Sequence, residues 1–222
     1  YAVSAAADTG LAPALRSRYC DERLIVPSPK HIPAAFVSAL ERIALRREYT
    51  ALLPGGDASL LAISRHGRRL EELVQIGLPP AATVERSVDK ILLLEDGAAA
   101  GMPPPPTVVC SSPAEVGEAA DEVGYPVVLK PRCSILEEAS GIRHLAVAQA
   151  SSRDEAESAA AALGLPLIVQ RYETNVERIS CGGVFALDDL LGVAVARFKR
   201  TWPPGAGAAS FAETVEPPDG LV

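Results

Sequence analysis

The chain has 222 residues, of which 48% are hydrophobic and 22% are charged. This composition allows a buried core in one large or two small domains. The formal net charge of -7 excludes a surface built to neutralise a run of nucleic-acid or anionic-membrane phosphates, although it is compatible with a local anion site.

The cysteines and the apolar runs bear on the cellular compartment. Four cysteines, Cys20, Cys110, Cys133 and Cys181, are scattered without a C-x-x-C pair. They predict reduced structural thiols rather than disulfides or a metal site. No apolar run reaches the ~18 residues of a membrane span, and the first residues are not typical of a signal peptide. We therefore expect a cytoplasmic protein that binds neither nucleic acid nor membrane.

Strand and helix patterns alternate through residues 1–86. Strands are expected at residues 1–7, 23–26 and 50–54, and helices at residues 33–47 and from residue 57. This alternation predicts a parallel, Rossmann-like sheet. Gly55-Gly56 follows the third strand, but no G-x-G-x-x-G is present. A dinucleotide-binding protein, one alternative, would require that fingerprint. The chain also begins with a strand pattern and no methionine, which predicts that it starts inside a fold.

A helix is expected at residues 87–100, followed by the proline-rich connector at residues 103–106. Lys90 lies in the first turn of this helix, where a cation opposes the helix dipole unless an anion shares the site. The alternative is a solvated lysine beside Glu85 or Asp89.

Two helix–strand units follow the same pattern. Each has a helix, then a Gly-x-Pro (Gly124-Tyr125-Pro126 and Gly164-Leu165-Pro166), then a short apolar strand. The sixth residue after each glycine is polar, namely Lys130 and Gln170. We therefore expect the two strands to present a phosphate-seeking cation and a hydrogen-bonding amide at equivalent positions.

The remaining segments are simpler. Residues 131–144 predict a flap, residues 144–148 a strand, and residues 184–187 and 192–198 an antiparallel hairpin turning at residues 188–189. A loop is expected at residues 203–207, followed by an acidic stretch at residues 213–219.

Several of these segments resemble the ATP-grasp superfamily, in particular its carbamoyl-phosphate-synthase-like carboxylate–amine ligases. The resemblance rests on Ser87-Val88-Asp89-Lys90, on the prolines before Thr107, and on residues 124–131 and 169–172. Residues 17–20 and 26–29 are similar to the pre-ATP-grasp domain of those ligases. The resemblance implies an α/β and α+β chain: a partial Rossmann-like pre-ATP-grasp domain at residues 1–86 and the N-terminal portion of an ATP-grasp fold at residues 87–222.

The resemblance also implies which residues bind ATP. Lys90 and Lys130 would contact its phosphates, Gln170 would face the adenine, and the backbone of Arg171 and Tyr172 would read the edge of the base.

Three further roles come from the same resemblance. Glu177 would hold the ribose hydroxyls, and Lys199 and Arg200, placed after the second hairpin strand, would meet the γ-phosphate or an acyl phosphate. The alternative for Lys199 and Arg200 is a solvated strand end.

Two departures favour a different class of function. Residues 131–144 contain only Gly141 as glycine and carry Glu137 and Glu138, whereas the flap of such ligases is glycine-rich. The family's Mg²⁺ ligands are expected beyond Val222, and Glu213 and Glu216 do not match their pattern. A non-catalytic nucleotide-binding or scaffold module is therefore the alternative to an enzyme.

The expected activity is ATP-dependent activation of a small-molecule carboxylate to an acyl phosphate, which an amine then attacks to give an amide. Because catalysis of this kind depends on positioning and charge neutralisation, Lys90, Lys130, Lys199 and Arg200 are the candidate residues. The chain alone is expected to be inactive. An incomplete sheet would expose apolar edges, which predicts association into a homo-oligomer.

Overall fold

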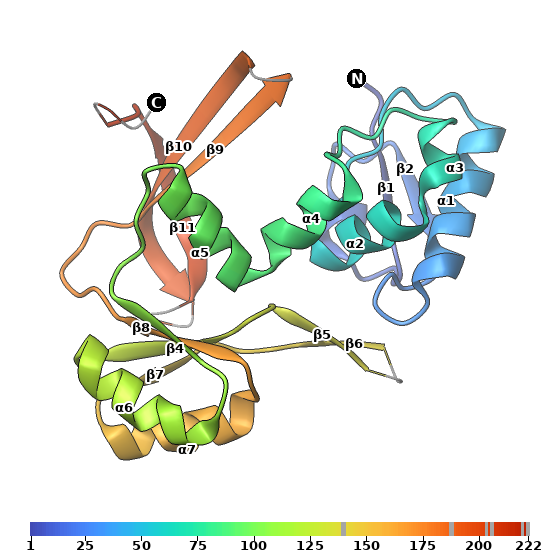
Figure 1. The fold of residues 1–222 in the computed structure, drawn as a ribbon. Coiled ribbons are helices and arrows are strands. Elements are labelled where there is room, and N and C mark those ends of the chain that lie inside the picture. Colours follow the sequence, from blue (N-terminus) through green and yellow to red (C-terminus); the bar gives the residue numbers. More distant parts are fainter. Residues whose placement is uncertain (139–140, 187–188, 203, 205–206, 219, 221–222) are drawn as a thin grey trace. The chain divides into compact units, whose positions relative to one another are not determined.

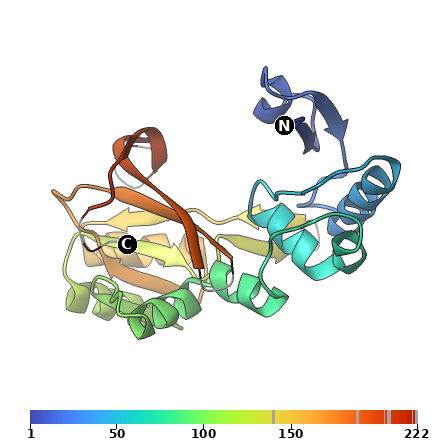
Figure 2. The same ribbon diagram turned by 90° about the horizontal axis from the view of Figure 1, so that it is seen from above.

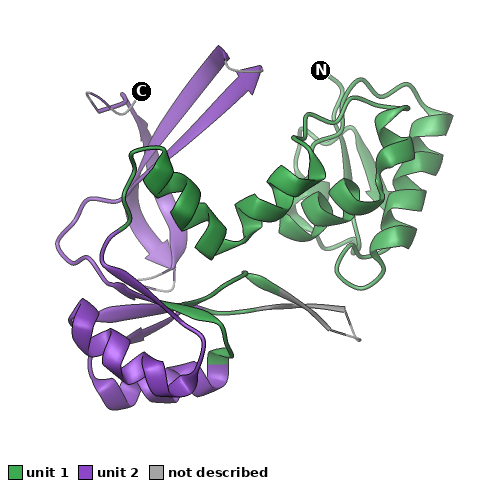
Figure 3. Ribbon diagram, viewed as in Figure 1, with its two compact units in different colours: residues 1–104, 130–146, 163–168 green, residues 105–129, 147–162, 169–222 purple. Residues whose placement is uncertain are grey.

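The computed structural model describes residues 1–138, 141–186, 189–202, 204, 207–218 and 220. Its contacts divide the chain into two compact units (Figure 3). Unit 1 comprises residues 1–104, 130–146 and 163–168, and unit 2 comprises residues 105–129, 147–162 and 169–222. The domain boundary expected between residues 86 and 87 stays a prediction.

Unit 1 begins with two parallel strands that are followed by helices (Figure 1). Strand β1 pairs with β2 in parallel, so that Ser4 lies opposite Glu22. The elements of this part are β1 (Ser4–Ala7), the 3-10 helix η1 (Pro13–Arg16), β2 (Glu22–Ile25), α1 (Pro33–Arg46), α2 (Asp57–His66) and α3 (Arg68–Glu71). The predicted parallel pairing is therefore present.

Helices α1 and α2 pack against each other in this part of the chain (Figures 1 and 2). Pro33 begins α1, where its missing N–H leaves no helical hydrogen bond unmade. Phe36, Val37 and Leu40 recur at helical spacing and are buried in one cluster with residues of α2 and α3. This apolar cluster is the core of the N-terminal part of the unit.

The strand expected at residues 50–54 is absent. Ala51 makes only an isolated parallel bridge to Gln75, although Leu52 donates its N–H to the Gln75 carbonyl at 2.9 Å. Pro54 and the glycines that follow it stop the pairing, because proline has no N–H to donate and glycine has no side chain to pack.

The helix expected at residues 87–100 is two helices, α4 (Ala81–Val88) and α5 (Lys90–Ala99) (Figure 1). They meet at Asp89, whose φ of -91° and ψ of 108° are extended rather than helical. Lys90 is therefore the first residue of a new helix, as its expected first-turn position requires.

A four-stranded sheet has the order β3-β8-β4-β7. Its strands are β3 (Thr107–Cys110), β4 (Val127–Pro131), β7 (Ala148–Ala150) and β8 (Leu167–Arg171). Helices α6 (Pro113–Val123) and α7 (Arg153–Leu163) lie on one face of it (Figure 1). The two helices approach closely at Gly117, where an added Cβ would lie 2.3 Å from Glu157 Oε1.

The two predicted helix–strand units have the same backbone. Gly124 and Gly164 end their helices with φ of 84° and 78°, and both following X-Pro bonds are cis. A positive φ favours glycine, which has no Cβ to clash. The apolar residues of both strands, 127–129 and 167–169, are buried. The equivalence inferred from the sequence is therefore confirmed.

The other strands form two antiparallel groups. Strand β5 (Ile135–Glu138) pairs with β6 (Gly141–His144), and the strand expected at residues 144–148 is instead β7. Strand β10 (Asp189–Trp202) lies between β9 (Ile179–Ala186) and β11 (Ala208–Val215). The predicted hairpin is present, although Asp188 of its expected turn lies outside the described residues. Strand β11 begins directly after the expected loop at residues 203–207 and overlaps the start of the expected acidic stretch at residues 213–219.

Candidate functional site

Two lysines of unit 1 form the centre of the candidate site. Lys130 is near the end of β4 and Lys90 begins α5, and both are half-buried. Burial lowers the pKa of both side chains, and the positive charge of Lys90 lowers the pKa of Lys130 further. Two cations therefore lie near enough to repel each other in a partly desolvated environment.

Lys90 is tied to the segment that follows β4. Its Nζ donates to Ser134 Oγ at 2.9 Å, and its backbone N–H donates to the Arg132 carbonyl at 2.9 Å. Glu85, the expected surface partner, instead pairs with Arg65 at 3.2 Å. Lys90 is therefore a half-buried, hydrogen-bonded cation and not a solvated surface lysine.

Asp89 is a buried carboxylate beside this pair, with 7% of its surface exposed. It accepts hydrogen bonds from the backbone N–H groups of Ile91 and Leu92, and Arg132 Nε donates to it at 2.6 Å. Burial alone would raise the pKa of Asp89, but these donors together hold it below its usual value. Sequence reasoning missed Arg132, because nothing in its position after Lys130-Pro131 indicates that it contacts Asp89, 43 residues earlier in the chain.

The predicted adenine residues lie in unit 2 on and after β8. Gln170 is 7% exposed, and its Nε2 donates to Thr107 Oγ1 at 2.8 Å. The backbone N–H groups of Arg171 and Tyr172 donate to the carbonyls of Pro106 and Pro126, both at 2.9 Å. These N–H groups are therefore engaged within the protein, and recognition of a base at this point would use the main-chain carbonyls.

The segment between β8 and β9 carries further polar contacts. Arg178 donates to the Tyr172 hydroxyl, and its guanidinium carbon lies 5.4 Å from the centroid of the Tyr172 ring. Glu177, the predicted ribose ligand, pairs with Arg197 of β10 at 2.8 Å and is largely exposed. The tyrosine–arginine contact was not inferred from the sequence, where nothing in the spacing distinguishes it.

Lys199 and Arg200 were expected after the end of a strand, but both lie within β10. A β-bulge interrupts the β10–β11 register at this point, where Phe198 pairs with Ala212 and Arg200 with Phe211. Lys199 Nζ pairs with Glu213 at 2.7 Å. The expected position was wrong because β11 was not foreseen, and with it the partner strand that extends β10. Both side chains of this pair are exposed, at 40% and 42%, so the alternative of solvated basic residues stays open.

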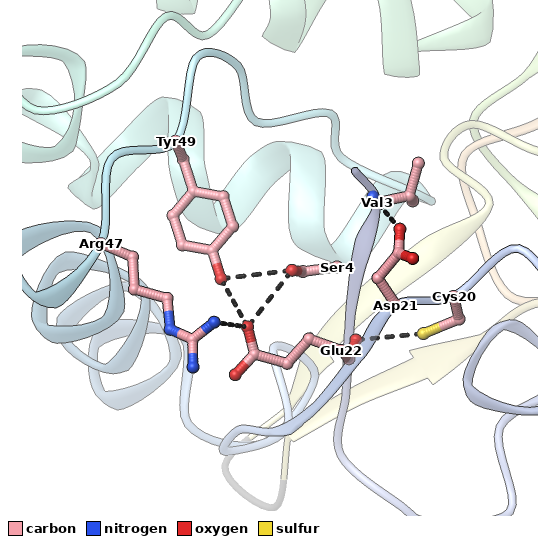
Figure 4. Close-up of polar contacts among 7 residues, drawn as sticks. All are labelled: Val3, Ser4, Cys20, Asp21, Glu22, Arg47 and Tyr49. Carbon is pink, nitrogen blue, oxygen red and sulfur yellow. Dashed lines mark hydrogen bonds and ion pairs between the residues drawn. The ribbon is translucent and has the colours of Figure 1, made fainter. Parts of the chain in front are cut away.

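A second polar cluster in unit 1 surrounds Glu22 (Figure 4). Glu22 Oε2 lies 2.8 Å from Arg47, 3.1 Å from the Tyr49 hydroxyl and 3.4 Å from Ser4 Oγ. Ser4 and Glu22 are the first residues of the parallel strands β1 and β2. Open parallel sheets bind ligands at the carboxyl ends of their strands. The cluster is at the opposite ends, and it links the end of α1 to the two strands.

Magnesium ligands were expected beyond this chain. Within the described ranges, no group of three or more His, Cys, Asp and Glu side chains could hold a metal ion. Glu213 is paired with both Arg197 and Lys199. Glu213 is therefore engaged by two cations of the protein. In the same part of the chain, no helix is both long and apolar enough to cross a bilayer.

No family model matches the sequence, and no curated protein matches it either. Solved structures do match the fold. An L-amino acid ligase from Bacillus licheniformis is 12% identical with a TM-score of 0.59, over 91% of this chain and 45% of its own. The biotin carboxylase domain of 2-oxoglutarate carboxylase from Hydrogenobacter thermophilus, solved with MgADP, ADP and bicarbonate, is 20% identical with a TM-score of 0.58, over 90% and 46%.

A third match is the carboxyaminoimidazole ribonucleotide synthase from Aspergillus clavatus, complexed with ATP. It is 18% identical with a TM-score of 0.58, over 86% of this chain and 46% of its own. The chain has part of an ATP-grasp fold. The predicted fold class is thereby confirmed. The chain spans less than half the length of each of these ATP-grasp structures.

Proposed function

We propose that this chain is the nucleotide-binding portion of an ATP-dependent carboxylate–amine ligase, with Lys90 and Lys130 as ligands of the ATP phosphates. The observation that carries the proposal is the pair of half-buried lysines whose pKa values burial lowers, that of Lys130 further through the charge of Lys90. Two cations that repel each other while partly desolvated are stabilised by a polyanion that contacts both. The ATP-grasp fold supports the choice of ATP as that anion.

The proposed reaction has two steps. A carboxylate oxygen attacks the γ-phosphorus of ATP while the bond to the ADP oxygen breaks, giving an acyl phosphate and ADP. An amine then attacks the acyl carbon, inorganic phosphate leaves, and the amine loses a proton to give the amide. Lys90 and Lys130 would orient the phosphate chain and neutralise its charge, which is the protein's main contribution to phosphoryl transfer.

The nucleoside end of ATP is proposed to contact residues on and after β8. Gln170 would border the adenine, the carbonyls of Arg171 and Tyr172 would read its edge, and Glu177 would hold the ribose. Lys199 and Arg200 are the proposed contacts of the γ-phosphate or acyl phosphate. Magnesium would neutralise phosphate charge when bound with ATP, but the described residues do not form its site, and no step is assigned to it.

A second candidate function is a nucleotide-binding or scaffold module without catalysis. The pairing of Lys199 with Glu213 favours it, because a lysine neutralised within the protein contributes less to stabilising a transferring phosphoryl group. A cytoplasmic location, small-molecule substrates and homo-oligomerisation remain predictions for either function.

Calorimetric titration with ATP, with and without Mg²⁺, tests the phosphate assignment. Replacing Lys130 or Lys90 with Ala is expected to weaken ATP binding by about 1.5–3 kcal/mol each, the range for a hydrogen bond to a charged group. Lys30→Ala is the matched control, because Lys30 lies outside the site and should leave the affinity unchanged. Unchanged affinity in Lys130→Ala would overturn the assignment.

An assay of ADP release distinguishes the two candidate functions. The chain is incubated with MgATP and a panel of carboxylates and amines, beside the binding measurement. Turnover that depends on both substrates would establish the ligase in this chain. Nucleotide binding without turnover would support the non-catalytic module for the chain on its own.

A further inference from the structure

Asp89 uses its two carboxylate oxygens for different contacts. Oδ1 accepts from the N–H groups of Ile91 and Leu92, at 3.0 and 3.3 Å, and so caps the start of α5. Oδ2 accepts from Arg132 Nε at 2.6 Å. One buried side chain therefore links the helix that begins with Lys90 to the segment that follows Lys130.

Arg132 fixes the same junction through its main chain. It follows Lys130 by two residues, and its carbonyl accepts the N–H of Lys90 at 2.9 Å. The next residue, Cys133, makes an isolated antiparallel bridge with Asp89. Ser134 then accepts the hydrogen bond from Lys90 Nζ at 2.9 Å. Three consecutive residues after β4 thus contact Asp89, the N-cap of α5, or Lys90, its first residue.

The junction has to resist a repulsion. Lys90 and Lys130 are both partly desolvated, and the charge of Lys90 lowers the pKa of Lys130, so two like charges repel each other here. Asp89 and Arg132 form an ion pair across the junction, and Asp89 is buried.

We propose that Asp89 and Arg132 are positioning residues that hold Lys90 and Lys130 close enough together to bind one phosphate chain. The inference rests on the proposed function and deepens it. It assigns the pair no contact with ATP: Arg132 acts on the nucleotide through the placement of Lys90 relative to Lys130.

The molecule offers a matched control. Arg86 of α4 and Asp96 of α5 also form an arginine–carboxylate pair, with contacts of 2.6 and 3.1 Å, which joins these two helices. Both side chains are about half exposed, at 46% and 51%, and neither contacts a lysine of the site in the described structure. Arg86→Ala therefore removes an exposed ion pair of the same type and leaves in place the hydrogen bonds that join Asp89 and Lys90 to residues 132–134.

The experiment measures ATP affinity by calorimetry for the full chain and four variants: Arg132→Ala, Arg132→Lys, Asp89→Asn and Arg86→Ala. Arg132→Ala and Asp89→Asn are each expected to weaken ATP binding on the order of tenfold. Arg132→Lys should restore part of the loss, and Arg86→Ala should bind like wild type. Asparagine can still cap α5, so Asp89→Asn is expected to fold. Thermal unfolding of each variant checks this.

Two results separate positioning from other roles. If Arg132 bound phosphate directly, Asp89→Asn would leave affinity unchanged or raise it, and the proposal would be wrong. In a Lys90→Ala background, Arg132→Ala should have little further effect, because no second lysine remains to be positioned. An undiminished effect there would also overturn the proposal.

The outcomes distinguish this inference from the proposed function. If wild type does not bind ATP, or if Lys130→Ala binds as wild type does, the phosphate site itself is wrong and the positioning role is wrong with it. If both lysines are needed but Arg132→Ala binds ATP normally, only the positioning role is wrong.

Discussion

The two helix–strand units at residues 113–131 and 153–171 share a backbone and differ in one polar residue. Each has a glycine with positive φ after its helix, then a cis X-Pro bond and a buried strand. The first unit ends its apolar run with the half-buried cation Lys130, and the second with the neutral amide Gln170, which is 7% exposed and bonded to Thr107. The same scaffold therefore presents a charge where water still reaches it and an amide where water is excluded.

The largest effect is expected when a charged residue replaces Gln170 in the second helix–strand unit. Gln170→Lys puts a cation at a buried position beside the Thr107 hydroxyl, which cannot neutralise it. The free energy of unfolding should fall by about 3–5 kcal/mol, the range for an uncompensated buried charge. Urea denaturation measures it, with Lys130→Gln as the reciprocal control that should not destabilise. A loss below about 1 kcal/mol would show that the two positions are interchangeable.

The shared backbone predicts similar costs at the two glycines. Gly124→Ala and Gly164→Ala should each lower the free energy of unfolding by about 1–3 kcal/mol, because φ near 80° strains a residue with a Cβ. Gly55→Ala is the control, since it has open space around it and no positive φ in the structure. Chemical denaturation measures the free energy of unfolding of the three variants. If only one of Gly124→Ala and Gly164→Ala lowered it, the two units would not be equivalent.

The stability and the ATP affinity of the chain should depend on pH through Lys130, in the first helix–strand unit. Because the pKa of Lys130 is lowered from 10.5 in the folded chain, the unfolded state binds more protons between that lowered value and 10.5. The stability of unliganded wild type should therefore rise with pH across this window, relative to Lys130→Met. ATP affinity should fall in the same window, by about tenfold per pH unit once the amine is neutral.

Thermal unfolding and ATP titration between pH 7 and the upper end of this window, on wild type and Lys130→Met, measure both trends. Identical pH profiles for the two proteins would contradict the role of Lys130. The difference between the profiles is the informative quantity, because other groups titrate in the same range.

The smallest effect is expected at Glu177, which follows the helix–strand unit that carries Gln170. If it holds the ribose, Glu177→Ala should weaken ATP and ADP alike, by about 1 kcal/mol, since both carry the same sugar. Glu173→Ala is a suitable control, because Glu173 is a similarly exposed carboxylate paired with Arg171 at 3.2 Å. Calorimetry with both nucleotides decides the point. A loss confined to ATP would place Glu177 near the γ-phosphate instead.

Local signals were strong enough to predict the two repeated units. Glycine, proline and a short apolar run determine a cap, a turn and a buried strand from neighbouring residues alone. The helix break at Asp89 was missed because neither glycine nor proline marks it. Aspartate before Lys90 was nevertheless an available N-cap signal, with Ile91 and Leu92 supplying the amides that it accepts.

The features that the sequence did not predict depend on contacts between residues that are distant in the sequence, which no local pattern indicates. Strand β11 is alanine-rich, with weak strand propensity, and forms because β10 offers it a partner. The position of Lys199 follows from that pairing and could not be read without it. Similarly, Lys90 and Lys130 were each inferred as phosphate ligands, but the arginine that joins their two segments is recognisable only when residues 132–134 are seen in contact with Asp89 and Lys90.

Strand β9 has a consequence for handling the protein. It lies at one end of the order β11-β10-β9, its eight residues are exposed, and none of them is charged. Val184 and Phe185 are more than 60% exposed. Within the described sheet its outer N–H and C=O groups face no further strand, and uncharged edges of this kind recruit strands from other molecules. A lysine at position 182, in place of glycine, would be a practical way to keep concentrated samples from aggregating.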